Sequence, residues 1–421
     1  MRGYLRRVAS LERDVRLFMV YSLFSNLGMG VFALIFNLYL VGLGYNEAFI
    51  GAFNAAYTVA MGLACLGLGF LLNRYGAWIC ILAGTLEFIV ASFLLCFLTG
   101  PLPLLVLAVL TGVGTAVIQN VQMPFIIEWT PREHTPTAAA LASSLNAASI
   151  MVGSLVGGML PRPIGRLLGE MAESVEPYRW TLVAGVFLTV VGIIPVLLMQ
   201  TTRRQRHHAD FHVARTQLVS TGVRRQARRD VGALVLLGLF LALGVGAIEP
   251  FYNVLLDGMG VPASRIGLIF ALSGLAATLL SLAGPALFRR FGPVVAQTTV
   301  RMCHVPFHLL LLVFPTPLVV SLAYGTRRIS GSMAWPIESA HVGSLLPAPA
   351  RAHAFGLRSA SWNFGFAVAA LASGWVIATT GSYAPAYIAV GIFCTLSVLV
   401  YVVNYGWRGV ERTAGGAAVV R

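Results

Sequence analysis

The sequence is poor in charge, and it contains no lysine at all. Only 10% of its 421 residues are charged, whereas 57% are hydrophobic, and all 29 basic residues are arginine. Soluble domains carry roughly 25% charged residues, so this composition excludes a soluble globular protein and indicates an integral membrane protein. We interpret the absence of lysine as codon bias.

Cysteine is also scarce. The five cysteines stand singly in apolar stretches, with neither the spacing of a metal site nor that of a disulfide framework. The sequence has no Walker loop. It also has no cluster of a nucleophile, a base and an acid such as an enzyme requires. We therefore expect no catalytic residue, no metal and no cofactor, so any transport must draw on an ion gradient or on the solute gradient itself.

Apolar runs, in contrast, fill most of the chain. About 20 apolar residues cross a hydrocarbon core of roughly 30 Å, and twelve windows have that length. They lie near residues 17–42, 48–72, 77–99, 102–129, 137–160, 178–200, 231–256, 264–288, 293–314, 317–345, 352–380 and 383–406. The first window follows a basic segment but is too long for a signal-peptide core, so we expect it to be a retained membrane helix.

The arginines sort onto one side of these twelve spans. Of the 29, 22 fall on the side of the two termini, 4 on the other side and 3 within spans. By the positive-inside rule both termini are cytoplasmic, as is the basic segment 201–230, and for a bacterial-type protein this places the chain in the inner membrane. The segment fits a solvated loop near anionic headgroups better than a nucleic-acid site. We expect contacts with membrane lipids, none with nucleic acid, and a monomer.

The two halves of the sequence repeat each other. Residues 27–76 align without a gap to 243–292. Matched pairs include Gly28/Gly244, Asn37/Asn253, Gly44/Gly260, Gly51/Gly267, Arg74/Arg290 and Gly76/Gly292, and Gly158/Gly374 follows later at the same offset. Parallel repeats of this kind build transporters whose solute site lies near the membrane midplane between the repeats. We predict an all-α membrane protein with twelve transmembrane helices in two pseudo-symmetric six-helix bundles, 1–200 and 231–421, joined by the loop 201–230.

The loop between the second and third predicted helices carries a recognisable motif. It reads GFLLNRYGAW, and a degenerate copy, PALFRRFG, stands at the matching place in the second half. With six plus six helices and a basic central loop, this motif resembles that of the major facilitator superfamily, Gly-x-x-x-Asp-Arg-x-Gly. The resemblance covers nearly the whole chain and implies alternating access. The gate-loop residues it implies are Gly69, Asn73, Arg74, Gly76, Arg290 and Gly292.

The motif also departs from the family pattern. Asn73 replaces the family's acidic residue, which argues against a latch based on charge, and Ala77 and Trp78 replace the basic pair that usually follows. Glycine remains at the end of both copies, where a tight turn needs a positive φ. We therefore expect the turn to be kept without its usual ion pair.

Six ionisable residues fall within predicted spans: Glu87, Glu249, Arg301, Arg327, Arg328 and Glu338. Each costs at least about 2.5 to 3.5 kcal/mol at a helix centre, so each is expected to face a cavity or a partner. From their depths we predict a structural ion pair between Arg301 and Glu338, and a contact of Glu249 with Arg327 across the cavity. Glu249 and Glu87, which has no matched arginine, are the predicted proton-coupling residues.

One arginine is then in surplus. Arg327 and Arg328 stand about 100° apart around a helix, so only one can face a given neighbour. A guanidinium group is a planar fork for carboxylate or phosphate, and we expect the surplus arginine to bind an anionic group of the solute; the alternative is a bond to backbone carbonyls.

Uncharged polar residues complete the predicted solute site. They lie on the cavity-facing sides of helices 1, 4 and 7, and interhelix hydrogen bonding is their alternative role. They are Asn37, Gln119, Asn120, Tyr252 and Asn253. Arg301, His304 and His308 form one stripe of helix 9, which we interpret as packing histidines rather than as a proton relay or a metal site.

The function favoured by the sequence is secondary active transport of a small organic solute, as proton-coupled export. Residues 153–158, GSLVGG, are similar to the Gly-Pro-x-x-Gly-Gly element of the family's antiporters, with serine in place of proline, although close helix packing explains the same glycines and is the interpretation we prefer. Uptake of an anionic metabolite and flipping of a lipid or lysolipid on the same fold are the alternatives.

Overall fold

The computed structural model describes residues 12–130, 135–199, 221–345 and 348–416. All regular secondary structure in these ranges is helical. The predicted basic segment before residue 12 and most of the predicted loop 201–230 lie outside the described residues.

Contacts divide the chain into two compact units. The first unit comprises Met1–Asn46, Ala56–Phe211 and Asn253–Leu272, and the second comprises Glu47–Ala55, His212–Tyr252 and Ser273–Arg421. Each unit therefore includes one short segment from the other half of the sequence. The division into bundles at 1–200 and 231–421 stays a prediction.

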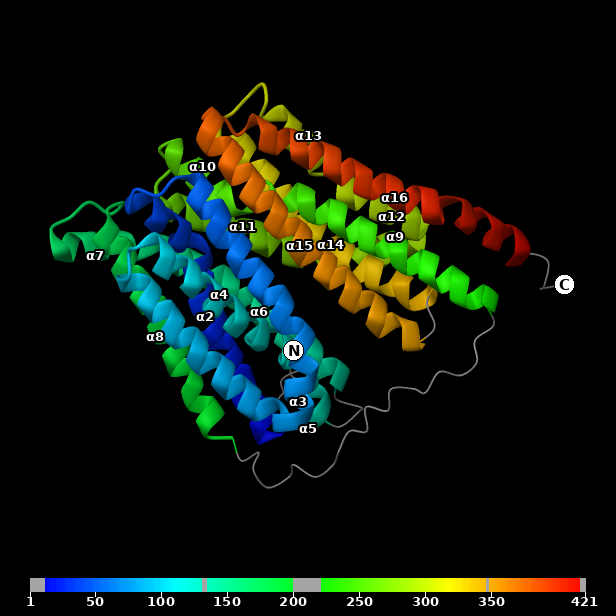
Figure 1. Ribbon diagram of the computed structural model, residues 1–421, viewed down its shortest axis with the longest axis horizontal. Coiled ribbons are helices and arrows are strands. Elements are labelled where there is room, and N and C mark those ends of the chain that lie inside the picture. The colour runs from blue at the N-terminus through cyan, green and yellow to red at the C-terminus, as the bar shows by residue number, and fades with distance from the viewer. Residues whose placement is uncertain (1–11, 131–134, 200–220, 346–347, 417–421) are drawn as a thin grey trace. The chain divides into compact units, whose positions relative to one another are not determined.

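The N-terminal half of the chain folds around one helix. Its helices are α2 (Arg13–Gly42), α3 (Glu47–Phe97), α4 (Pro101–Asn120), α5 (Gln122–Trp129), α6 (Thr135–Met159), α7 (Pro161–Leu168) and α8 (Val175–Leu197). Both α6 and α8 pack along α2 (Figure 1). Side chains of α2 such as Val15, Leu34 and Tyr39 are fully buried, whereas Leu63, Leu66 and Phe70 of α3 are exposed, as expected for a helix that meets lipid.

The C-terminal half repeats this plan. Its elements are α9 (Thr221–Gly246), the 3-10 helix η2 (Glu249–Phe251), α10 (Tyr252–Gly258), α11 (Ala263–Ser281), α12 (Gly284–Met302), α13 (Val305–Leu310), α14 (Pro317–Leu345), α15 (Ala348–Thr380) and α16 (Ala384–Gly416). Here α15 and α16 pack along α9, and α12 packs against α14 (Figure 1). The central helix of each half is thus the first one, as the duplication predicts.

Nine helical stretches in the described part of the chain are long and apolar enough to cross a membrane. The number differs from the twelve predicted spans for two reasons. The 51-residue α3 contains two predicted spans separated by a turn at Gly76. The predicted ninth span falls on α12 and α13, which are separate short helices. The predicted tenth span falls on α14, which carries charged residues, so neither span is both long and apolar enough to be counted. The count of twelve stays a prediction.

The duplication is visible in the backbone. In the described residues, positive φ angles occur only at glycine, and four of these six glycines form two matched pairs. Gly44 and Gly260 have φ of 89° and 77°, and Gly76 and Gly292 have 81° and 78°. Only glycine adopts this region at low cost, so the turn that ends each gate loop has one geometry in both halves. This agrees with the positive φ that the loop motif predicts.

Two crossings between helices leave no room for a side chain. A Cβ atom at Gly51 would collide with the carbonyl oxygen of Ala370, and one at Gly158 would lie 2.6 Å from that of Ala263. Their partners across the crossing are Gly374 and Gly267. Since Gly51 matches Gly267 and Gly158 matches Gly374 in the duplication, one crossing is built twice, once in each unit.

Residues 153–158 also serve helix packing. Gly153 lies against the backbone of Leu27 and Gly30, Gly157 lies against Val31, and the Ser154 hydroxyl donates to the Gly30 carbonyl at 3.2 Å. Small residues let two membrane helices approach closely. Within the first unit, close packing of α6 on α2 therefore accounts for this run.

We expect Gly158→Ala and Gly51→Ala each to destabilise the protein by about 1 to 3 kcal/mol, because the added methyl group forces apart backbones already in contact. The measurement is thermal unfolding in detergent. Gly67→Ala is the control, since a Cβ there meets no atom within 4 Å and alanine favours helix. Equal melting temperatures for Gly158→Ala and Gly67→Ala would contradict the crossing.

Candidate functional site

In the described part of the chain, three predicted spans are interrupted beside candidate polar residues. One is broken at Val121 between α4 and α5, one at Ile248 before η2, and one at His304 between α12 and α13. Each restarted segment has a proline within its first three residues, which fixes φ and lacks an N–H, so the preceding turn cannot continue regularly. Irregular backbone at membrane depth is tolerated only when buried in protein or lining a cavity. Most of the candidate polar residues lie beside these breaks.

The break before η2 carries the pair Glu249 and Arg327. Arg327 Nη2 donates to Glu249 Oε1 at 2.6 Å, and the side chains are 10% and 25% exposed. The contact is single: Glu249 Oε2 and Arg327 Nε are buried without a hydrogen-bond partner among the described residues. A buried ion pair gains most when its remaining groups are also bonded, so this pair is incompletely satisfied.

Arg328 follows on α14 but differs from its neighbour. Its side chain is half-buried, and it makes no hydrogen bond or ion pair with any described residue. Arg327, in contrast, is buried and held by Glu249. Of the adjacent pair, Arg328 is therefore the arginine without a carboxylate partner among the described residues.

Tyr252 begins α10, directly after η2. Its side chain is fully buried, its hydroxyl is hydrogen-bonded to His308 Nε2, and its ring packs edge-on against Tyr324 with centroids 5.1 Å apart. Its neighbour Asn253 donates to the Leu34 carbonyl at 2.7 Å and accepts from its next backbone N–H. Both side chains thus have internal partners in this structure.

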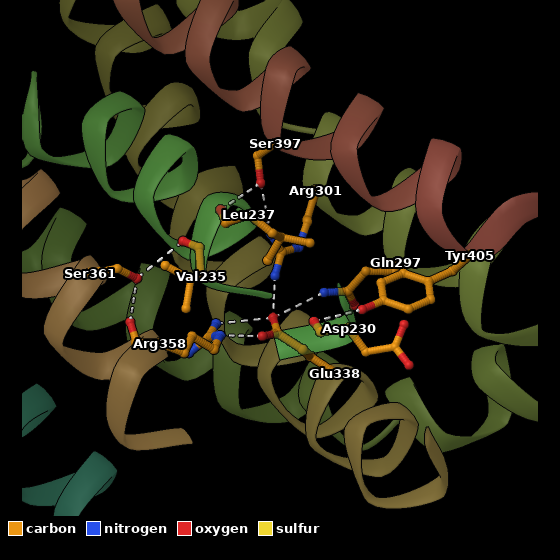
Figure 2. Close-up of polar contacts among 10 residues, drawn as sticks. All are labelled: Asp230, Val235, Leu237, Gln297, Arg301, Glu338, Arg358, Ser361, Ser397 and Tyr405. Carbon is orange, nitrogen blue, oxygen red and sulfur yellow. Dashed lines mark hydrogen bonds and ion pairs between the residues drawn. The ribbon is translucent and has the colours of Figure 1, made fainter. Parts of the chain in front are cut away.

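A second charge cluster lies among α12, α14, α15 and α16 (Figure 2). Glu338 forms ion pairs with both Arg301 and Arg358, and all three side chains are at most 7% exposed. Arg358 Nη2 donates to Glu338 Oε2 at 3.0 Å while its Nε pairs with Oε1. Arg301 Nη1 also reaches Ser397 Oγ at 3.1 Å, and Ser397 donates to the Leu237 carbonyl of α9.

The sequence analysis missed Arg358. It lies one turn or more inside α15, but it was counted with the loop charges because it stands near a helix end. Its guanidinium lies 4.8 Å from the centre of the Trp335 ring, and Trp335 precedes Glu338 by three residues. The signal that could have found Arg358 is its position inside the predicted span 352–380.

The polar residues of the first unit are mostly amides. Asn26 donates to Asn146 at 3.1 Å and Asn146 to Gln122, whose Nε2 is buried without a partner in the described chain. Gln119 and Asn120 are exposed at the end of α4, where Asn120 bonds the Ala116 carbonyl and Cys65. These amides offer hydrogen bonds but no charge.

Two further candidates also lie in the first unit. Asn37 is half-buried on α2. Both carboxylate oxygens of Glu87 are buried and accept no hydrogen bond from any described residue, and Oε2 lies beside Gly114. A carboxylate without a partner is costly inside a membrane protein, so Glu87 has the surroundings of a group that carries a proton.

The gate-loop residues are solvent-facing. Gly69, Asn73, Arg74 and Arg290 are exposed, and the two guanidinium groups lie over neighbouring aromatic rings, Arg74 over Tyr75 at 5.5 Å and Arg290 over Phe291 at 5.3 Å. Side chains of Glu128 and His341 lie outside the described set.

Comparison with known proteins places the chain in a family. The family model of the Major Facilitator Superfamily matches residues 18–326. The chain belongs to the Major Facilitator Superfamily. An uncharacterised MFS-type transporter, MJ1560 of Methanocaldococcus jannaschii, is 21% identical over 373 residues, which cover 88% of this chain and 92% of that protein.

Solved structures show the same fold. The nucleoside transporter NupG superposes with a TM-score of 0.72 at 14% identity, covering 94% of this chain and 99% of its own. A D-xylose-proton symporter superposes with a TM-score of 0.70 at 13% identity, covering 92% and 96%. The protein is therefore a multi-pass membrane transporter of this superfamily, and not an enzyme.

The two charge clusters of this transporter are expected to respond differently to mutation. Glu338→Gln leaves two buried arginines without a carboxylate, and breaking a buried ion pair costs about 3 to 5 kcal/mol. We expect little folded protein in fluorescence-detected size-exclusion chromatography, whereas Glu249→Gln, with one contact in a more exposed place, stays folded. Equal yields and melting temperatures for the two variants would contradict this ranking.

Proposed function

We propose that this transporter is a proton-coupled secondary carrier of a small organic solute with an anionic group. The observation that carries the proposal is the contrast between its two carboxylates. Both carboxylate oxygens of Glu338 form ion pairs with arginines. Glu249 makes one contact with Arg327, and its second oxygen and the Arg327 Nε have no hydrogen-bond partner among the described residues. The first arrangement suits a fixed scaffold, and the second suits a pair that opens and closes.

Proton coupling follows from the chemistry of the open pair. When Glu249 takes up a proton it no longer attracts Arg327 as a charge, and a buried guanidinium is left without a counter-charge. An anionic solute bound by the adjacent Arg328 can supply that charge, so proton binding at Glu249 and solute binding are positively linked. Glu87, with no partner among the described residues, is the second candidate for a transported proton.

The anionic group is assigned to Arg328. An arginine within a membrane helix is retained at a cost, and Arg328 has no internal acceptor in the described structure to offset it. Its fork of N–H donors matches a carboxylate or phosphate. The other residues predicted from the sequence, Asn37, Gln119, Asn120, Tyr252 and Asn253, stay predictions. Tyr252 and Asn253 already have internal partners in this structure.

A proton and a solute that bind together are carried in the same direction, so this linkage favours proton symport and uptake, the alternative of the sequence analysis, over export by antiport, in which the two would compete. We propose a monomer in the inner membrane, with both termini cytoplasmic. The glycine run 153–158 is used for packing, so it lends export no further support. The D-xylose-proton symporter shares the fold, which supports proton coupling on this scaffold but not a direction.

A thermal-shift screen of the purified protein tests the solute class. Candidates are dicarboxylates, sugar phosphates, neutral sugars, nucleosides, cationic drugs and lysolipids, because a ligand that binds the native state raises the melting temperature. We expect stabilisation by organic anions only, and its loss in Arg328→Ala. Arg74→Ala, which removes an exposed arginine from a gate loop, is the matched control. Stabilisation by cationic drugs or lysolipids alone would contradict an anion carrier.

A transport assay tests the direction. Proteoliposomes loaded with the stabilising anion are given a pH gradient of either sign. Proton symport predicts that solute and protons enter the side equivalent to the cytoplasm together, and solute that leaves this side as protons enter it would instead support export by antiport. Solute movement that ignores both gradients would contradict proton coupling.

A further inference from the structure

A buried hydrogen bond joins the Tyr252 hydroxyl to His308 Nε2. His308 lies on α13, and its side chain and that of Tyr252 are both 0% exposed. A buried hydrogen bond between a tyrosine and a histidine joins two polar groups that would be costly to bury alone. It ties α13 to the residue that directly follows η2.

The geometry fixes the proton arrangement on His308. Its Nδ1 lies 2.8 Å from the carbonyl oxygen of His304, and a carbonyl oxygen can only accept, so Nδ1 carries the proton. In the neutral ring Nε2 is then an acceptor, and the Tyr252 hydroxyl donates to it. His308 is therefore occupied at both nitrogens, with Tyr252 as its donor.

Tyr252 connects three elements around the open ion pair. It belongs to the end of η2, which begins with Glu249; its hydroxyl is held by α13; and its ring packs on Tyr324 of α14. Tyr324 precedes Arg327 by three residues, so both project from one face of α14. One side chain thus sets the distance between the segment that carries Glu249 and the helix face that carries Arg327.

The ionisable groups around the Tyr252–His308 pair come from every neighbouring element. Those close enough to interact with it electrostatically are Glu249 from η2, Tyr324 and Arg327 from α14, His304, and Cys394 from α16, with Arg301 acting on His304. Glu249 is the one carboxylate in this set of described residues, and it pairs with Arg327, whereas Arg301 pairs with Glu338. A change in the position of Tyr252 therefore alters the contact between Glu249 and Arg327 first.

We propose that His308 is a positioning residue for proton coupling. By accepting the Tyr252 hydroxyl it holds η2 at the one spacing that lets Glu249 reach Arg327. The proposal rests on the proposed function, because that function gives Glu249 the coupled proton. His308 itself keeps its proton on Nδ1 and does not carry the transported one.

Three variants separate positioning from proton carriage. His308→Phe removes the acceptor, and Tyr252→Phe removes the donor. His308→Gln cannot titrate, but it can place an amide oxygen near the position of Nε2 and accept the same hydroxyl. Tyr21→Phe is the matched control, because it deletes another buried tyrosine hydroxyl, bonded to Thr85 at 2.8 Å in the first unit.

The readout is infrared difference spectroscopy of the full-length protein in lipid as the pH is lowered, with the proton as the only ligand. Protonation of a carboxylate produces a carbonyl band, and the part of that band missing from Glu249→Gln belongs to Glu249. We expect this band to appear at a pH about one unit higher in His308→Phe and Tyr252→Phe, a tenfold change in proton affinity, because the contact with Arg327 is loosened. His308→Gln and Tyr21→Phe keep the wild-type midpoint.

The outcomes are distinct. If the Glu249 band is present but His308→Phe and Tyr252→Phe keep its wild-type midpoint, this inference is overturned and the proposed function stands. If His308→Gln shifts the band as far as His308→Phe does, titration of His308 is required and positioning is overturned. If wild type and Glu249→Gln give identical spectra, Glu249 binds no proton and both proposals fail.

Discussion

The structure of the second unit depends on a single carboxylate held between two arginines. Glu338 is buried with Arg301 and Arg358, and through Ser397 the cluster also reaches the backbone of α9 (Figure 2). Inside a membrane protein such charges are tolerated only together, since removal of one leaves the others without compensation. The cluster therefore fixes four helices as a unit, and it provides the rigid background against which the looser pair of Glu249 and Arg327 can change.

The polar chemistry does not follow the duplication that shapes the fold. The turn glycines Gly76 and Gly292 match, and so do the two glycine crossings. The first unit, however, carries an amide chain of Asn26, Asn146 and Gln122, while the second carries the charges. Packing and turn geometry depend on backbone requirements that both copies share, whereas the charged residues are not repeated between the copies.

Much of this arrangement could be predicted from the sequence, because membrane helices convert residue number into depth at about 1.5 Å per residue. That relation pointed to Arg301 with Glu338 and to Glu249 with Arg327, and the structure contains both contacts. The direction of a side chain around its helix is not given by depth, which is why Arg327 and Arg328 could not be told apart. Arg358 was missed because it was counted with the loop charges. The helix breaks were also missed, although Pro250 and Pro306 mark two of them, because apolar composition continues through each break.

The central claim is that Glu249 exchanges its single contact for a proton during transport. The most direct measurement is simultaneous recording of proton and solute flux in proteoliposomes of wild type and Glu249→Gln, with counterflow exchange of the same solute as the reference. We predict that Glu249→Gln retains counterflow but loses proton-driven flux. Equal loss of both activities, or proton-driven flux equal to that of wild type, would contradict the account.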